Sequence, residues 1–197
     1  MIRMRHAAQV NARPEANEII LINSHDGASS YQMLAGVFRF VCCNGLVCGT
    51  VANDIRIPHK GNVQDEVIEG AFRVLDDFEA VDASAEAMKA LTLDEGEELA
   101  FATAALSLRY GEERSEGQPP APITAAQLVE ARRIEDTGRS LWTSFQRIQE
   151  NVMRGGQPGR STQGRRVRSR EVASIDRGVS LNRALWVLAE EMRKLKH

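Results

Sequence analysis

The residues with the clearest chemical potential form a run of arginines in the second half of the chain. Between residues 154 and 170 there are six arginines and four glycines, with no aspartate or glutamate. The arginines are Arg154, Arg160, Arg165, Arg166, Arg168 and Arg170. Arginine offers a planar fork of donors that suits phosphate oxygens, and unneutralised positive charges attract polyanions. We therefore predict that this Arg/Gly-rich basic loop contacts phosphates. The alternative is a solvated surface loop without a ligand.

Two further cations are candidate members of the same binding surface. Arg39 lies within an apolar stretch that resembles a strand, where a charge needs a partner. The partner is either an acid on a covering helix, for which Asp65, Glu66 and Glu69 are the nearest candidates, or a bound anion. Lys60, which follows the last short apolar segment of this region, is expected to extend the cationic groove.

Histidines, cysteines and an aspartate in the first third of the chain suggest two other chemistries. These residues are His25, Asp26, Cys42, Cys43, Cys48 and His59. His25, Asp26 and Cys43 have the residue types of a nucleophilic set, but they are equally well explained as turn residues and a small core residue. The cysteines with a histidine could ligate zinc, but no Cys-x-x-Cys pair exists and neighbouring Cys42 and Cys43 point to opposite faces of a strand. We expect no metal, no cofactor and no catalytic residues, which favours a protein that is not an enzyme.

The composition is that of an ordinary globular protein. The chain has 197 residues, of which 43% are hydrophobic and 26% charged, and its formal net charge is −2. Such a balance argues against a uniformly basic nucleic-acid binder, so the uneven distribution of charge matters more than its sum. An odd number of cysteines without paired spacing indicates a reducing compartment. No apolar run is long enough for a membrane span, and no signal-peptide core is visible, so we expect a cytoplasmic protein without membrane contact.

The N-terminal third predicts an antiparallel β-meander. Residues 1–10 suit a short edge strand, and the aliphatic run within 18–24 suits a strand that is buried on both faces. Gly36 indicates a bulge or a close backbone approach. Asp26-Gly27 and Asn44-Gly45 are the expected hairpin turns.

Helical periodicity dominates from residue 63 onward. The predicted helices cover residues 63–78, 83–91, 92–110, 124–153 and 181–195. Their expected N-terminal caps are Asp82, Thr92, Thr124 and Ser180, and Gly138 is expected to break or kink the fourth helix. The apolar stripe of that helix, which includes Trp142 and Phe145, is interpreted as core.

These elements predict an α+β fold. Residues 1–110 form the antiparallel sheet with its covering amphipathic helices, residues 111–122 form a proline-rich charged linker, and residues 123–197 form a helical part that carries the basic loop.

Several strings of residues together resemble a known family. They are Asn23–Gly27, Gly36–Cys42, Asn44–Leu46, Leu141-Trp142, Gln149–Asn151, Gly155-Gly156 and Leu181–Trp186. They are similar to the phage- and plasmid-borne family of unknown function DUF nine-three-two, over nearly the whole chain. The resemblance implies a cytoplasmic protein of a mobile element, with no assigned catalytic residues. Members usually carry a longer segment before the sheet, so we expect a member that is short at its N-terminus.

Three functions from different classes follow. The first is an accessory protein of a phage or plasmid that binds nucleic acid without sequence specificity, of single-strand DNA annealing type, and assembles as a homo-oligomer. No recognition helix with base-reading side chains is apparent. The second is an inhibitor of a host defence complex, which would use the acidic runs Asp76–Glu79 or Asp94–Glu98 to engage a host protein. The third, an enzyme built on His25 or His59, has the least support.

Overall fold

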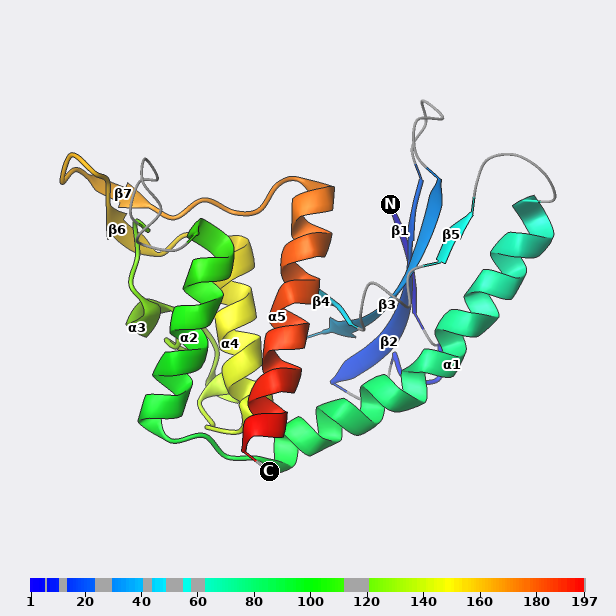
Figure 1. Cartoon of the computed structure of the whole chain (residues 1–197), viewed down its shortest axis with the longest axis horizontal. Helices are drawn as coiled ribbons and strands as arrows, with labels where there is room; N and C mark the ends of the chain where they lie inside the picture. Colours follow the sequence, from blue (N-terminus) through cyan, green and yellow to red (C-terminus); the bar gives the residue numbers. More distant parts are fainter. Residues whose placement is uncertain are drawn as a thin grey trace. The chain divides into compact units, whose positions relative to one another are not determined.

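The structure, a computed structural model, divides into two compact units. They comprise Met1–Ala83 and Ser84–His197 (Figure 1). Residues 1–5, 7–10, 14–23, 30–40, 44–48, 55–57, 63–111 and 121–196 are described here. The first unit holds an antiparallel sheet and most of one long helix, and the second holds the remaining helices and a small hairpin. The α+β class predicted from the sequence is confirmed.

Five strands form the sheet of the first unit. They are β1 (Ile2–Arg5), β2 (Glu15–Ile22), β3 (Tyr31–Arg39), β4 (Asn44–Val47) and β5 (Ile55–Ile57). The order is β1-β2-β3-β4, and β5 also pairs with β3, all antiparallel. The meander and its N-terminal edge strand are therefore confirmed. Asn44 and Gly45, however, lie in β4 and not in a turn, and the Asp26-Gly27 turn falls outside the described residues.

The core of this unit explains the apolar run of the second strand. Ile19 and Ile20 point to opposite faces of the sheet and are 8% and 0% exposed, as expected for a strand buried on both faces. On the Ile19 face, residues of β3 and β5 pack against α1 (Val63–Ala90) through Val74 and Phe78. The predicted close approach occurs at Gly36, where an added Cβ would lie 2.6 Å from the Leu46 carbonyl oxygen.

Helix α1 is longer than the sequence predicts. Asp82 does not cap a second helix but lies within α1, where its side chain accepts a hydrogen bond of 3.1 Å from the Asn17 amide on β2. An aspartate side chain often accepts a hydrogen bond at the start of a helix, but the Asp82 side chain accepts one from the neighbouring sheet instead.

The second unit is a helical bundle built around one helix that is buried on every side. Its helices are α2 (Glu95–Tyr110), α3 (Ala125–Leu128), the 3₁₀ turn η2 (Ile134–Asp136), α4 (Leu141–Arg154) and α5 (Ile175–Leu195). Helices α2, α4 and α5 lie side by side (Figure 1). Phe145 of α4 is in ring contact with Phe101 of α2 and Trp186 of α5, at centroid distances of 6.5 and 6.1 Å. The predicted apolar stripe is therefore core.

Several predicted helix boundaries were wrong. The cap of α2 is Asp94 and not Thr92, and the cap of α5 is Ser174 and not Ser180. The capping box at Thr124 is present, but α3 ends at Leu128 and a new helix begins after the cap Ser140. None of the helices in the described parts of the chain combines the length and the apolar character that crossing a bilayer requires.

Candidate anion-binding surface

The arginine-rich segment is an ordered β-hairpin and not a loop. Strands β6 (Pro158–Arg160) and β7 (Arg166–Arg168) pair antiparallel, with Pro158 opposite Arg168 and Arg160 opposite Arg166. At its tip, Gly164 adopts a φ of 73° and its amide donates to the Ser161 carbonyl oxygen over 2.8 Å. Because side chains alternate along a strand, Arg160, Arg166 and Arg168 share one face of this ribbon.

Glycines fix the base of the hairpin against the bundle. Gly155, with a φ of 60°, ends α4, and a Cβ there would lie 2.5 Å from the backbone carbon of Arg170. At Gly159, a Cβ would lie only 1.9 Å from the Pro122 carbonyl oxygen. That same oxygen accepts a hydrogen bond of 2.9 Å from the Arg160 amide. The ribbon is therefore fastened to the segment that precedes α3, and only glycine permits the contact.

A buried amide network supports the same base. Asn151, which is 1% exposed, donates to the Leu128 and Glu130 carbonyl oxygens over 2.8 and 2.9 Å. Its own oxygen accepts from the Gln157 side chain over 2.8 Å and from Arg132. Since buried amides are costly when unpaired, this network favours one position of the hairpin.

Arg132 links that network to the end of α4. Its guanidinium also donates to the Gly155 carbonyl oxygen. Burial lowers the pKa of Arg132 below its ordinary value, an effect that the nearby Glu150 carboxylate opposes. Arginine remains charged even so, because its ordinary pKa is far above neutrality.

The charge on the hairpin is largely unneutralised. All six arginines are exposed. Arg154 lies 3.7 Å from the Glu150 carboxylate. Within the described residues, no carboxylate lies within ion-pair distance of the other five. Arg160 and Arg168 instead donate to the backbone carbonyl oxygens of Gly164 and Gly156, over 3.1 and 2.8 Å. Such bonds orient a guanidinium without cancelling its charge.

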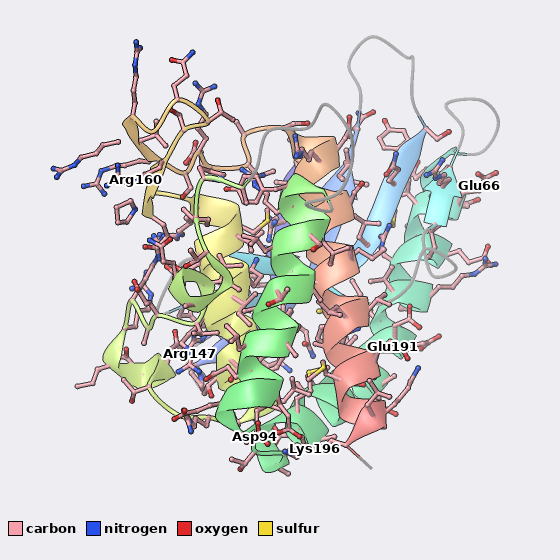
Figure 2. The ribbon with its side chains drawn as sticks, turned by 60° about the vertical axis from the view of Figure 1, so that its left-hand side comes forward. Glu66, Asp94, Arg147, Arg160, Glu191 and Lys196 are labelled. Atoms are coloured by element: carbon pink, nitrogen blue, oxygen red, sulfur yellow. The ribbon has the colours of Figure 1, made fainter. Side chains whose placement is uncertain are left out.

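Figure 2 shows the consequence for the surface. Nitrogen-tipped side chains fan outward from the hairpin around the labelled Arg160. Arg147, in contrast, lies within the bundle, where it is 6% exposed and paired with Glu98. The cations of the hairpin are thus available to a ligand, whereas Arg147 is part of a buried ion pair within the bundle.

Sequence reasoning missed two arginines beside the hairpin. Arg109, at the end of α2, is 8% exposed and donates to the Arg170 carbonyl oxygen over 2.7 Å. Arg177, in the first turn of α5, donates to the Arg109 carbonyl oxygen over 3.0 Å. Arg109 lies 61 positions before Arg170, and Arg177 lies 68 positions after Arg109, so no local signal in the sequence indicates either contact.

The remaining predicted site residues lie elsewhere. Arg39 is 7% exposed, and its guanidinium is 3.9 Å from the carboxylate of Glu15, its register partner on β2. This agrees with the interpretation of a salt-bridged charge, but the acid lies on a neighbouring strand and not, as expected, on a covering helix. Lys60, His25, Asp26, Cys42, Cys43 and His59 fall outside the described residues. Cys48 is a buried free thiol, and the described part of the chain contains no cluster of three or more potential metal ligands.

The acidic run Asp94–Glu98 is engaged within the second unit. Asp94 accepts from the Glu97 amide to cap α2, and Glu97 is bonded to Lys196. The Glu97 carboxylate accepts hydrogen bonds from Lys196 and from the Asp94 backbone amide, and these two bonds lower the pKa of Glu97. Glu95 pairs with Arg139 at 2.8 Å, and Glu98 is buried against Arg147. The run therefore presents little free negative charge.

Comparison with known proteins places the chain in a family. Two proteins of Escherichia coli K12, the UPF0380 proteins YfjQ and YafZ, are each 48% identical over 192 residues, which cover 98% of this chain and 68% of theirs. No solved structure matches significantly. The family model described as "Domain of unknown function (DUF932)" matches residues 1–186. The chain therefore belongs to the DUF932 family, whose function is unknown.

Proposed function

We propose that this chain is a cytoplasmic accessory protein of a mobile element that binds nucleic acid without sequence specificity, through the hairpin β6–β7. The observation that carries the proposal is the row of exposed arginines on that ribbon, which have no carboxylate partner among the residues that the structure describes. Contacts between arginine and phosphate release counterions from nucleic acid and supply non-specific affinity.

The distribution of charge supports binding through this face. The formal net charge is −2 for the whole chain, so the part outside the six hairpin arginines carries −8. A polyanion is therefore attracted to the hairpin, whereas the rest of the chain carries a net negative charge. Such an asymmetry orients the protein during diffusional encounter.

The composition of the ribbon favours binding without sequence preference. The exposed side chains of the ribbon are predominantly arginines. In protein–nucleic acid complexes, arginine contacts the phosphate backbone of the nucleic acid unless a groove aligns it with base edges. We propose single-stranded DNA as the ligand, with self-association of the chain to align hairpins along a strand and assist annealing. Oligomeric state is tested by light scattering with and without an oligonucleotide, and a monomer in both conditions contradicts self-association.

Salt-dependent binding is the direct test of the proposal. The affinity for a fluorescein-labelled single-stranded oligonucleotide is measured by anisotropy at several salt concentrations, with a duplex of the same length alongside. We expect the logarithm of the binding constant to fall linearly with the logarithm of salt concentration. Replacing Arg165 and Arg166 by glutamine should reduce that slope by about 1.4, because each single-strand phosphate contact contributes about 0.7.

A matched variant separates local contacts from net charge. Arg73 and Lys194 are exposed and pair with Glu69 and Glu191 on their own helices, at distances typical of surface ion pairs. Replacing both by glutamine changes the net charge as much as the Arg165/Arg166 pair does. If the two double variants weaken binding equally, or if the parent protein shows no binding at low salt, the proposal is refuted.

The acidic run Asp94–Glu98 gives little support to the alternative, inhibition of a host defence complex. Three of the carboxylates in Asp94–Glu98 pair with basic side chains of the same unit. A surface that imitates a polyanion needs free carboxylates, which leaves only the short run Asp76–Glu79 of α1 for such a role. We therefore favour nucleic-acid binding over this alternative.

A further inference from the structure

A hollow of about 450 Å³ adjoins the hairpin within the second unit. Four separate segments line it: the end of α2, the residue Pro122 before α3, the hairpin and the first turn of α5. This volume lies within the usual range of small-ligand sites and is large enough for one nucleotide. Its walls combine arginines and hydroxyl groups with apolar surface.

Positive charge is concentrated around this hollow. The lining arginines are Arg109, Arg160, Arg168, Arg170 and Arg177. No acidic residue is part of the described lining. Five like charges around one space repel each other, and a bound anion with more than one charge offsets that repulsion. The arrangement therefore favours a multiply charged anion over a neutral ligand.

Backbone carbonyl oxygens hold several of these guanidinium groups in place. Arg109 donates to Arg170, Arg177 to Arg109 and Arg168 to Gly156, over 2.7, 3.0 and 2.8 Å. Each of these bonds uses one nitrogen and leaves other donors of the same group for a ligand. The Nε of Arg109 is buried and has no hydrogen-bond partner in the described structure. Groups that are oriented before binding lose less entropy when they bind.

The uncharged part of the lining suits a nucleoside. The ring of Tyr110 lies 5.5 Å from the Arg109 guanidinium carbon, and Pro122 and Val167 add apolar surface. Aromatic rings stack with bases of any sequence. The hydroxyl groups of Ser161 and Thr162 provide further hydrogen-bonding groups.

We propose that this hollow binds the phosphomonoester of a nucleotide, with the terminal phosphate of a nucleic-acid strand as its source. This inference rests on the proposed function for the choice of source. A phosphomonoester carries nearly two negative charges and three terminal oxygens, whereas each internal diester carries one charge. The hairpin residues Arg165 and Arg166, which are outside the lining, then hold internal phosphates, and the hollow holds the strand end.

The test compares oligonucleotides that differ only in their ends. One has a 5′-phosphate, one a 3′-phosphate and one hydroxyl groups at both ends, and each competes with a labelled single strand at fixed salt. We expect one phosphorylated form to bind roughly tenfold more tightly than the hydroxyl form, as an additional charge-assisted contact would produce. Equal affinity of all three for the parent protein overturns the proposal.

Two variants distinguish the contribution of the hollow to binding from that of the hairpin. Arg177→Gln lies in the hollow but outside the hairpin, and should remove the preference for the phosphorylated end while leaving the affinity for the hydroxyl form nearly unchanged. The Arg165→Gln/Arg166→Gln variant should weaken all three oligonucleotides by the same factor and keep the preference. If the preference survives Arg177→Gln together with Tyr110→Ala, the phosphate binds elsewhere and the proposal is wrong.

Binding of free thymidine 5′-monophosphate tests the hollow independently of oligonucleotide binding. If no oligonucleotide binds at low salt, the proposed function fails. Binding of thymidine monophosphate that depends on Arg177 then retains the hollow as a phosphomonoester site with a free nucleotide as its source. If the monophosphate also fails to bind, the hollow has no such role. The failure of one proposal can therefore be distinguished from the failure of the other.

Discussion

Arg160 lies directly opposite Arg166 across the two strands of the hairpin. Like charges at opposed positions of an antiparallel pair destabilise the pairing, by up to about 1 kcal/mol. No acid of the described residues pairs with either side chain. A sequence selected for stability alone would place an opposite charge at one of these positions, so the arrangement is consistent with a binding role that outweighs a small loss of stability.

The first prediction concerns that opposed pair. Arg166→Glu should raise the free energy of unfolding by about 0.5 kcal/mol, because a repulsive cross-strand pair becomes attractive. The same change should weaken single-stranded DNA binding severalfold. Urea denaturation and anisotropy measure the two effects. Lys194→Glu, which changes the charge equally on α5, serves as the control, and equal losses of affinity in both variants would contradict a role for the hairpin.

The second prediction concerns the attachment of the hairpin. Gly159→Ala places a Cβ within 1.9 Å of the Pro122 carbonyl oxygen, so the strand must move away and lose the hydrogen bond from the Arg160 amide. We expect loss of DNA affinity with the helical bundle still folded. Circular dichroism reports the helices, and amide exchange reports the hairpin.

Gly138→Ala is the matched control for that change. A Cβ there would lie 3.6 Å from the nearest atom of Thr143, which is ordinary contact. DNA affinity should therefore stay at the parent level. If Gly159→Ala also leaves both affinity and exchange unchanged, the anchoring of the ribbon through Pro122 is wrong.

The buried ion pair of Glu98 and Arg147 gives a third prediction. The two side chains are 7% and 6% exposed, and the Ser144 hydroxyl also donates to Glu98 over 2.6 Å. Removing one partner leaves a buried charge without compensation, so Glu98→Leu should cost about 3 to 5 kcal/mol of stability. Replacing both by apolar residues, as in Glu98→Leu/Arg147→Met, should cost less than that single change. Urea unfolding of these two variants and of Arg147→Met checks this, and additive losses in the double variant would contradict it.

The start of α2 shows why a helix boundary can be misplaced when only the sequence is known. The sequence contains two competing start signals before α2, because Thr92 and Asp94 are each followed three residues later by glutamate. Asp94 forms the cap. Thr92 instead makes a bridge to Ser140, and the Leu93 amide donates to the Arg139 carbonyl oxygen over 2.9 Å. These contacts join residues more than 40 positions apart, so local sequence does not contain them.

The candidate site also depends on contacts between residues that are distant in the sequence. The charge of segment 154–170 could be predicted because it depends only on composition. Its hairpin could not, because each strand has three residues and the pairing depends on the approach of Gly159 to Pro122. Arg109 and Arg177 were missed because their contacts are long-range: Arg109 donates to the Arg170 carbonyl oxygen 61 positions away, and Arg177 donates to the Arg109 carbonyl oxygen 68 positions away.

Glu18 provides the last prediction, which concerns pH. Its side chain on β2 is fully buried and is bonded to Arg3, and Arg5 lies 3.6 Å away. Burial raises the pKa of Glu18 above its ordinary value of 4.5, and the two arginines only partly offset this effect. The folded state therefore binds the Glu18 proton more tightly than the unfolded state does. Stability from this group is present below the ordinary pKa and is lost as pH rises through the raised pKa.

Glu18→Gln tests this because glutamine keeps the shape and an acceptor oxygen but does not ionise. The free energy of unfolding of the parent, minus that of the variant, should decrease as pH rises from 4 to 7, since all other titrating groups are common to both proteins. Urea denaturation at several pH values in this range measures the difference. An increase with pH would mean that Arg3 and Arg5 stabilise the carboxylate more than burial destabilises it, because a lowered pKa produces the opposite slope.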